Sequence, residues 1–153
     1  MGARSASIVR ARATDLLEFE AVAAAFAREL RPGDVVALYG ALGSGKTTFV
    51  AAVARALGNR AEIASPTFTF WHRYGGTPAL EHIDLFRLEN PAEAAELGLE
   101  EAFGDDRIVL VEWPERLPGL LPPWAIGVHI AGAGDGPREI AIERPGEGGG
   151  QPA

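Results

Sequence analysis

Eight residues, from Gly40 to Thr47, have the types and spacing of a phosphate-binding loop. They read GALGSGKT and match the pattern G-x-x-x-x-G-K-[ST], in which glycines let backbone N–H groups point at phosphate oxygens. In this pattern the lysine, here Lys46, reaches the β- and γ-phosphates, and the hydroxyl group of Thr47 ligates Mg²⁺. Lys46 is the only lysine of the chain, although lysine and arginine together number 14. A slender ammonium group fits between phosphates where a planar guanidinium group does not, so this exception supports a phosphate site.

Two acidic residues, Asp84 and Glu112, are candidates for the remaining magnesium chemistry. Glu112 ends the apolar run Ile108–Val111, which is typical of a buried parallel strand, and ligands of such sheets bind at the carboxyl ends of strands. We therefore expect Glu112 to hold Mg²⁺ together with Thr47, as a Walker B-like acid. Asp84 is expected to lie in the outer shell of Mg²⁺ or to orient the attacking water. A solvated Glu112 and a turn-forming Asp84 are the structural alternatives.

Further candidates flank these acids. The two-residue period of a strand over residues 80–86 places His82 on the same face as Asp84, either at the site or as the partner of another buried group. Trp113 either shields the site or packs under Pro114. Three arginines could each offer a guanidinium group to phosphate, although surface arginine is the ordinary explanation: Arg73, Arg87 and Arg138.

The elements around the loop have the order that a phosphate site requires. Val35–Tyr39 is an apolar run of strand length, and Thr47–Leu57 is an alanine-rich helical pattern that ends at Gly58. Asp34–Leu57 therefore predicts a strand, a glycine-rich turn and a helix, whose N-terminus adds partial positive charge at the loop.

The rest of the chain alternates between strand and helix patterns. We predict strands over 5–13, 67–74, 80–86 and 108–111, an antiparallel hairpin over 125–130 and 139–143, and helices from Leu16 to Pro32-Gly33 and from Asn90 to about Phe103 with a break near Gly98. The fold class is α/β: a P-loop NTPase-like three-layer α/β/α sandwich with a mostly parallel sheet and an antiparallel hairpin near the C-terminus. Residues 1–145 are expected to form a single P-loop ATPase domain, and 146–153 a disordered tail rich in glycine and proline.

Composition narrows the function. The net charge of −7 argues against independent binding to a nucleic-acid backbone, so any RNA is expected to be held by a partner. The absence of cysteine excludes thiol catalysis and thiolate metal sites. The sequence has no signal peptide or membrane-spanning pattern, so we expect a cytoplasmic protein without membrane contact. The N-K-x-D route to guanine recognition needs a second lysine, which makes ATP the expected nucleotide.

Four motifs in order resemble the TsaE (YjeE) family of tRNA threonylcarbamoyladenosine biosynthesis P-loop ATPases. They are YGALGSGKTTF at 39–49, SPTF at 65–68, HIDLFRL at 82–88 and VEWPE at 111–115, and the resemblance extends from Ala11 to Glu143. Two positions depart from the family pattern: Ala41 stands where an acid is common, and Phe86 where a tyrosine is common.

The resemblance implies a Mg-dependent ATPase that acts with the TsaB–TsaD heterodimer to modify the tRNA adenosine adjacent to the anticodon. It implies that Thr47 and Glu112 hold Mg²⁺, that Lys46, Asp84 and Glu112 are catalytic, and that Ser65–Phe68 form a nucleotide-responsive switch. The residues expected to bind ATP or ADP are Leu42, Gly43, Ser44, Gly45, Lys46, Thr47, Thr48, Asp84, Trp113, Glu115 and Arg138.

Two other functions are compatible with a phosphate loop in a chain of this size. A small-molecule kinase would need an acceptor pocket and usually an arginine-bearing lid, and residues 92–110 contain no convincing lid segment. A nucleotide-dependent binding module would bind its partner in the ATP state without needing hydrolysis.

Overall fold

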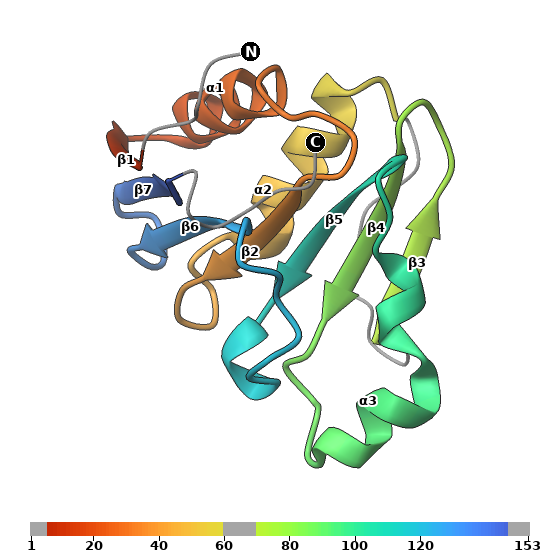
Figure 1. The fold of residues 1–153 in the computed structure, drawn as a ribbon. Coiled ribbons are helices and arrows are strands. Elements are labelled where there is room, and N and C mark those ends of the chain that lie inside the picture. Colours follow the sequence, from red (N-terminus) through yellow and green to blue (C-terminus); the bar gives the residue numbers. More distant parts are fainter. Residues whose placement is uncertain (1–5, 60–69, 147–153) are drawn as a thin grey trace.

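The computed structural model describes residues 6–59 and 70–146. These residues form one seven-stranded sheet in the order β1-β7-β6-β2-β5-β4-β3, with three α-helices and two short 3₁₀ helices (Figure 1). The strands are β1 (Ser7–Ala13), β2 (Val35–Tyr39), β3 (Trp71–Tyr74), β4 (Ala79–Asp84), β5 (Arg107–Glu112), β6 (Ile126–Ala131) and β7 (Arg138–Arg144). The helices are α1 (Leu16–Ala27), α2 (Lys46–Ala56) and α3 (Pro91–Leu97), with the 3₁₀ helices η1 (Leu99–Ala102) and η2 (Pro114–Arg116).

The centre of the sheet is parallel. Strand β2 pairs in parallel with β5 and β6, and β4 pairs in parallel with β5. Strands β3 and β7 run antiparallel to their neighbours, and β1, which is antiparallel to β7, again runs with the central strands. Within the described residues, only β3 and β7 therefore oppose the common direction, which confirms the mostly parallel sheet and the antiparallel hairpin formed by β6 and β7.

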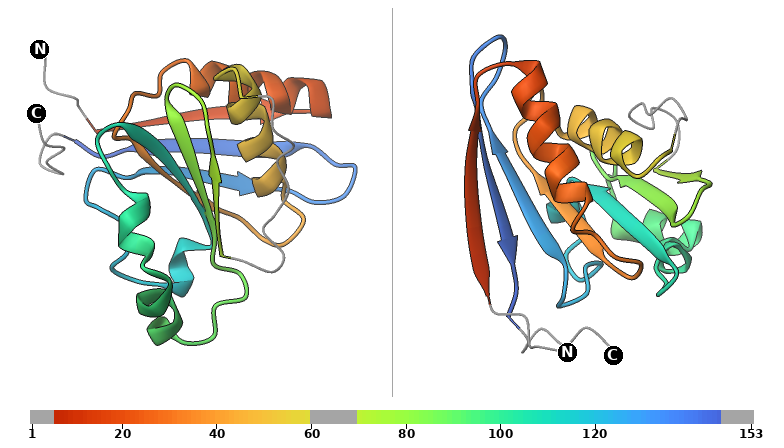
Figure 2. Two further views of the ribbon diagram at one scale, coloured as in Figure 1. Left: turned by 90° about the vertical axis from the view of Figure 1, so that its right-hand side faces the viewer. Right: turned by 90° about the horizontal axis from the view of Figure 1, so that it is seen from above.

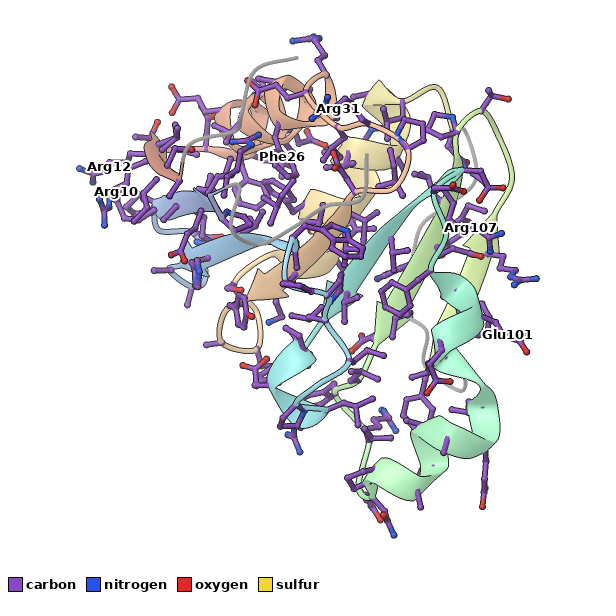
Figure 3. All side chains as sticks on the ribbon, viewed as in Figure 1. Arg10, Arg12, Phe26, Arg31, Glu101 and Arg107 are labelled. Atoms are coloured by element: carbon purple, nitrogen blue, oxygen red, sulfur yellow. The ribbon has the colours of Figure 1, made fainter. Side chains whose placement is uncertain are left out.

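Helices cover both faces of the sheet, as Figure 2 shows. Helices α1 and α2 pack on one face, where the ring of Phe49 lies 5.9 Å from that of Phe19 and 5.8 Å from that of Phe26. Figure 3 labels Phe26 beside α1. On the other face, Ala94 of α3 and Leu99 of η1 pack against side chains of β2, β4 and β5. The two cores confirm the predicted three-layer sandwich.

Capping residues explain where α1 and α3 begin and where α3 ends. The carboxylate of Asp15 accepts a hydrogen bond from the backbone N–H of Glu18 and begins α1. Asn90 and Glu93 form a capping box at the start of α3, and Gly98 ends this helix with a φ of 65°. The predicted break near Gly98 is therefore confirmed, and η1 follows it.

Three predicted boundaries differ from the structure. Helix α1 ends at Ala27, before the Pro32-Gly33 pair, and Leu30 is buried beyond its end. Strand β4 ends at Asp84 and not at Phe86, because the Asp84 side chain accepts a hydrogen bond from the Phe86 N–H and starts a turn. Strand β3 begins at Trp71.

Several predictions concern residues that the structure does not describe. The switch predicted at Ser65–Phe68, the first part of the strand predicted over 67–74 and the tail at 147–153 lie outside the described residues. In the part that is described, no helix is both long enough and apolar enough to cross a membrane.

Candidate functional site

The glycine-rich loop joins the carboxyl end of β2 to the first turn of α2. Gly45 caps α2 with a φ of 113°, a backbone conformation that favours glycine. A Cβ atom on Gly40 would lie 2.5 Å from Ser44 Oγ and 2.7 Å from the Ile130 carbonyl oxygen, so this position has no room for a side chain. The Ser44 hydroxyl oxygen is buried and has no hydrogen-bond partner among the described residues. The loop is thus closely wound and holds an unused polar group.

A hydroxyl group and a carboxylate meet beside this loop. Thr47, in the first turn of α2, places Oγ1 2.9 Å from both Oε1 and Oε2 of Glu112. Glu112 ends β5, lies beside Leu38 of β2 in the parallel register and is only 2% exposed. Both groups are hard oxygen donors, the type that Mg²⁺ prefers, so these two residues fit the predicted cation site.

Asp84 lies next to Glu112 on the neighbouring strand. The two residues are paired in the parallel register of β4 and β5, and Asp84 is 7% exposed. Both line a cavity of about 310 Å³ together with Lys46 and Thr47. The structure therefore brings together the lysine, the hydroxyl group and the two acids that the sequence singles out. In the described part of the chain, no group of three or more histidine and acidic side chains could hold a metal ion alone.

Lys46 is directed back toward its own loop. Its Nζ donates to the carbonyl oxygens of Gly40 at 2.6 Å and Ala41 at 3.0 Å, and it lies 4.3 Å from the ring centroid of Trp113. Burial lowers the pKa of Lys46, and the charges of nearby carboxylates, Glu112 first, oppose this shift. Nζ donates to two carbonyl oxygens, and a lysine ammonium group has three N–H donors, so one donor remains for a phosphate in this arrangement.

Trp113 covers the lysine in an unusual backbone conformation. Its φ is 57°, and it is the only residue other than glycine with a positive φ in the part of the chain described. Its ring centroid lies 5.0 Å from that of Phe86, and the Arg116 guanidinium lies 5.8 Å from the Trp113 ring. Backbone strain of this kind costs of order 1–3 kcal/mol and often occurs at functional sites. Trp113 lines the Lys46 cavity, and Pro114 follows it in η2.

A second cavity, of about 320 Å³, adjoins the first. Its lining includes Gly45 and Thr48, which also line the Lys46 cavity, so the two cavities share part of their walls at the start of α2. The remaining lining comes from β1, α1, the loop and the β6–β7 turn: Ala13, Thr14, Asp15, Leu16, Phe19, Ser44, Gly134, Asp135, Gly136 and Arg138. Both cavities combine charged and aromatic groups: the first has Lys46, Asp84 and Glu112 beside Phe86 and Trp113, and the second has Asp15, Asp135 and Arg138 beside Phe19.

Arg138 ties the β6–β7 turn to the phosphate loop. Its Nε donates to the carbonyl oxygen of Ser44 at 2.8 Å, and its terminal nitrogens donate to the carbonyl oxygens of Gly136 at 2.7 Å and Gly134 at 3.0 Å. A longer contact of 3.4 Å reaches the Gly43 carbonyl oxygen. The sequence predicts Arg138 at the nucleotide, and in the structure its hydrogen-bond partners are backbone carbonyl groups of the loop and the turn.

The other predicted residues lie at varying distances from the centre. Leu42 is at the tip of the loop with 71% of its surface exposed. Glu115 is exposed in η2, and its negative charge acts on the pKa of Lys46 and of Tyr39. Arg73 does not reach the site, because its Nε lies 3.1 Å from Oε1 of Glu81. Arg87 is exposed.

One contact at the site was not predicted. His82 Nε2 lies 2.6 Å from Oε2 of Glu112, and both side chains are buried. The two-residue period of β4 places His82 on the face of Asp84, but the contact with Glu112 depends on the parallel register of β4 with β5. That register is a long-range property, and the sequence carries no local signal for it.

The fold and the loop define the class of this protein: it is an α/β protein of the P-loop type, with the glycine-rich loop between β2 and α2 and an acid at the end of the neighbouring strand β5. The family model of "Threonylcarbamoyl adenosine biosynthesis protein TsaE" matches residues 13–140. The chain therefore belongs to the TsaE family.

Relatives and a solved structure agree with this assignment. The chain is 38% identical over 115 residues to the tRNA threonylcarbamoyladenosine biosynthesis protein TsaE of Treponema pallidum, covering 75% of this chain and 85% of the relative. It is 40% identical over 126 residues to the TsaE protein of Bacillus subtilis, covering 82% of this chain and 78% of the relative. The crystal structure of Bacillus subtilis YdiB superposes with a TM-score of 0.75 and 34% identity, covering 93% of this chain and 88% of that one.

Proposed function

We propose that this protein is a Mg-dependent ATPase that acts in the threonylcarbamoyladenosine modification of tRNA. The observation that carries the proposal is the position of Thr47 against Glu112, beside the only lysine, at the N-terminus of α2. A helix N-terminus, a lysine and a hydroxyl–carboxylate pair together suit a polyphosphate with its Mg²⁺. The names of the relatives point to tRNA threonylcarbamoyladenosine biosynthesis, and the residues of the site support ATP hydrolysis as the reaction.

The two adjoining cavities suit the two halves of ATP. The cavity around Lys46, Asp84 and Glu112 would take the phosphates, because its lysine and loop N–H groups offer positive charge and hydrogen-bond donors. The cavity around Phe19 and Arg138 would take the nucleoside, because it adjoins the start of α2 away from Lys46, Thr47 and Glu112 and combines an aromatic ring with polar groups. Thr48 lines both cavities and would lie near the point where they join.

The residues of the site divide the chemical work. Mg²⁺, when bound, would neutralise charge on the phosphate oxygens, and Thr47 and Glu112 would hold it. Lys46 would leave the carbonyl oxygens of Gly40 and Ala41 and place its charge at the β- and γ-phosphates. Asp84, buried at the same strand ends, would orient the attacking water and accept its proton.

The proposal includes partners and a location. The TsaB–TsaD heterodimer would be the protein partner, and tRNA would be held by that complex, because this chain carries a net charge of −7. Turnover would be slow for the isolated chain and faster with the partner, since two carbonyl oxygens and the Trp113 ring hold the Lys46 ammonium group back against its own loop. We place the protein in the cytoplasm, where tRNA is modified.

Phosphate release from ATP, measured with and without TsaB–TsaD, tests this function. Lys46→Ala and Glu112→Ala should each lower the stimulated rate by at least about 100-fold, because each removes a group that stabilises charge in the transition state. Arg28→Ala and Glu100→Ala are matched controls: they remove a cation and an acid from exposed positions and should leave the rate unchanged.

Three outcomes would count against the proposal. Hydrolysis that persists in the Lys46 and Glu112 variants would show that the site is elsewhere. Transfer of labelled γ-phosphate to a metabolite would indicate a small-molecule kinase. Partner binding that needs ATP but proceeds equally with a non-hydrolysable analogue, with no phosphate released, would indicate a binding module.

A further inference from the structure

The buried histidine of β4 makes one specific hydrogen bond, and it makes it to the proposed magnesium-holding acid. His82 is 0% exposed, and its Nε2 lies 2.6 Å from Oε2 of Glu112. The same carboxylate receives the Thr47 hydroxyl at 2.9 Å from each oxygen. Glu112 is therefore held from two sides, by β4 and by α2.

The surroundings of the ring indicate that Nε2 carries a proton. His82 Nδ1 is buried and has no hydrogen-bond partner among the described residues. A proton on Nδ1 would be an unpaired buried donor, whereas a bare Nδ1 is only an unused acceptor, and an unpaired donor is the rarer situation in folded proteins. The proton therefore belongs on Nε2, which donates to Oε2 of Glu112.

This hydrogen bond gives the two oxygens of Glu112 different environments, because His82 contacts only Oε2. The Thr47 hydroxyl has one proton and can donate it to only one oxygen at a time. Each carboxylate oxygen has two lone pairs, so Oε2 can accept from both His82 and Thr47. Among the described residues Oε1 has only the Thr47 hydroxyl within hydrogen-bond distance, so it keeps more capacity for a cation or its bound water. The imidazole thus sets the direction in which the carboxylate presents its open oxygen.

We propose that His82 is a positioning residue for Glu112: it fixes the carboxylate beside Thr47 so that Oε1, the oxygen that His82 does not contact, stays available to a bound cation. This inference rests on the proposed function, because it concerns the same magnesium site. Hydrogen-bonded partners of metal ligands orient the ligand, and their loss typically weakens metal binding about 10- to 100-fold. His82 itself is not expected to touch the nucleotide or the metal.

The simpler explanation is that His82 only fills space in the core. Its ring centroid lies 6.3 Å from that of Tyr74, and a histidine at this position contributes packing like any buried ring. The two explanations differ in what a side chain substituted for His82 must retain. Packing needs ring volume at residue 82, whereas positioning needs a donor where Nε2 now lies.

Two substitutions separate these demands, and a third provides a control. His82→Phe keeps a ring and removes the donor, while His82→Gln loses the ring and keeps an amide donor near the Nε2 position. Leu80→Ala damages the core on the same face of β4, two residues earlier, without touching Glu112, because Leu80 is fully buried but makes no polar contact.

The measurement is the Mg²⁺ titration of ADP binding by calorimetry, with a parallel titration of ADP in EDTA. In His82→Phe the apparent Mg²⁺ dissociation constant should rise about 10- to 100-fold, while ADP affinity in EDTA stays at the wild-type value. His82→Gln should recover most of the Mg²⁺ affinity, and Leu80→Ala should lower Tm with normal Mg²⁺ affinity. Imidazole ¹⁵N spectra of the wild-type protein should show the Nε2–H tautomer.

The results distinguish failure of this inference from failure of the proposed function. If Glu112→Ala weakens Mg²⁺ binding and His82→Phe does not, His82 is a packing residue and the inference is wrong. An Nδ1–H tautomer, or equal loss of Mg²⁺ affinity in His82→Phe and Leu80→Ala, would overturn it as well. If the wild-type protein binds no ADP with or without Mg²⁺, the proposed function is wrong, and this inference, which rests on it, is wrong as well.

Discussion

The contact between Arg138 and the phosphate loop leads to a quantitative prediction. The Arg138 Nε donates to the Ser44 carbonyl oxygen at 2.8 Å in a half-buried position. A charged hydrogen bond of this kind contributes about 1.5–3 kcal/mol to the free energy of unfolding. The contacts of its terminal nitrogens with Gly136, Gly134 and Gly43 are exposed and contribute less. Arg138→Ala should therefore lower the free energy of unfolding of the nucleotide-free protein by about 2–4 kcal/mol.

Thermal unfolding without nucleotide is the assay. A loss of this size should lower Tm by roughly 5–15 °C in a domain of about 150 residues. Arg138→Lys should lie between the wild-type protein and Arg138→Ala, because one ammonium group replaces a planar fork of donors. Arg12→Ala is the matched control: Arg12 pairs with Glu139 at 3.4 Å with both side chains more than half exposed, so its loss should cost no more than about 0.5 kcal/mol.

A second measurement shows how Arg138 acts on the nucleotide. If the arginine holds the loop, Arg138→Ala should lose stability without nucleotide and should bind ADP more weakly as a result. The reasoning is refuted if Arg138→Ala unfolds at the same temperature as Arg12→Ala. Unchanged stability together with a large loss of ADP affinity would instead mean that the guanidinium group contacts the nucleotide directly, as the sequence predicts.

Three further predictions concern the loop, its lysine and the core beneath it. Burial lowers the pKa of Lys46 in the folded state, so the unfolded chain holds this proton to higher pH. The free energy of unfolding of the wild-type protein should therefore rise relative to that of Lys46→Met as pH approaches 10.5. Urea unfolding at several pH values tests this, and a stability difference that does not change with pH would contradict it. Phe49→Ala should cost about 3–5 kcal/mol in the same assay, because this ring is fully buried, and a cost below 1 kcal/mol would contradict the packing described. Gly45→Ala should cost about 1–2 kcal/mol of stability, because Gly45 has a φ of 113°, and it should also weaken ADP binding. Gly58→Ala is the control: Gly58 has a φ of 85° with open space around its Cα, so the substitution should lower stability alone. Equal ADP affinity in the two variants would refute the role given to Gly45.

Local sequence was sufficient for the elements that hold the site. The apolar run before Gly40 and the helical pattern after Thr47 predicted β2 and α2 to within one residue, because a buried strand and a helix have different periods. Cap chemistry at Asn90 and the glycine at Gly98 predicted both ends of α3. The acid at the end of β5 was placed beside the loop by the general rule for parallel sheets, and the structure places it there.

Contacts between distant segments were beyond this kind of reasoning. Arg138 meets Ser44 because a hairpin turn folds over the loop, and nothing near either residue specifies that approach. The pairing of His82 with Glu112 needs the register of two parallel strands separated by a helix. Trp113 was expected near the site, but its left-handed backbone could not be predicted, because it opposes the local preference of a bulky residue.

The pairing of β1 with β7 has a consequence for how the chain folds during its synthesis. Strand β1 emerges early from the ribosome, yet its neighbour in the sheet is β7, which is translated after all the other strands described here. Until Arg138–Arg144 is made, the N–H and C=O groups of β1 have no strand to pair with, and Ile8 and Val9, still 53% exposed in the finished fold, lie on that open strand. Pairs so distant in sequence form slowly, and unpaired strands favour aggregation. The parallel centre around β2 and β5 can therefore assemble before β1 finds its partner, and β1 stays an unpaired strand until β7 is available.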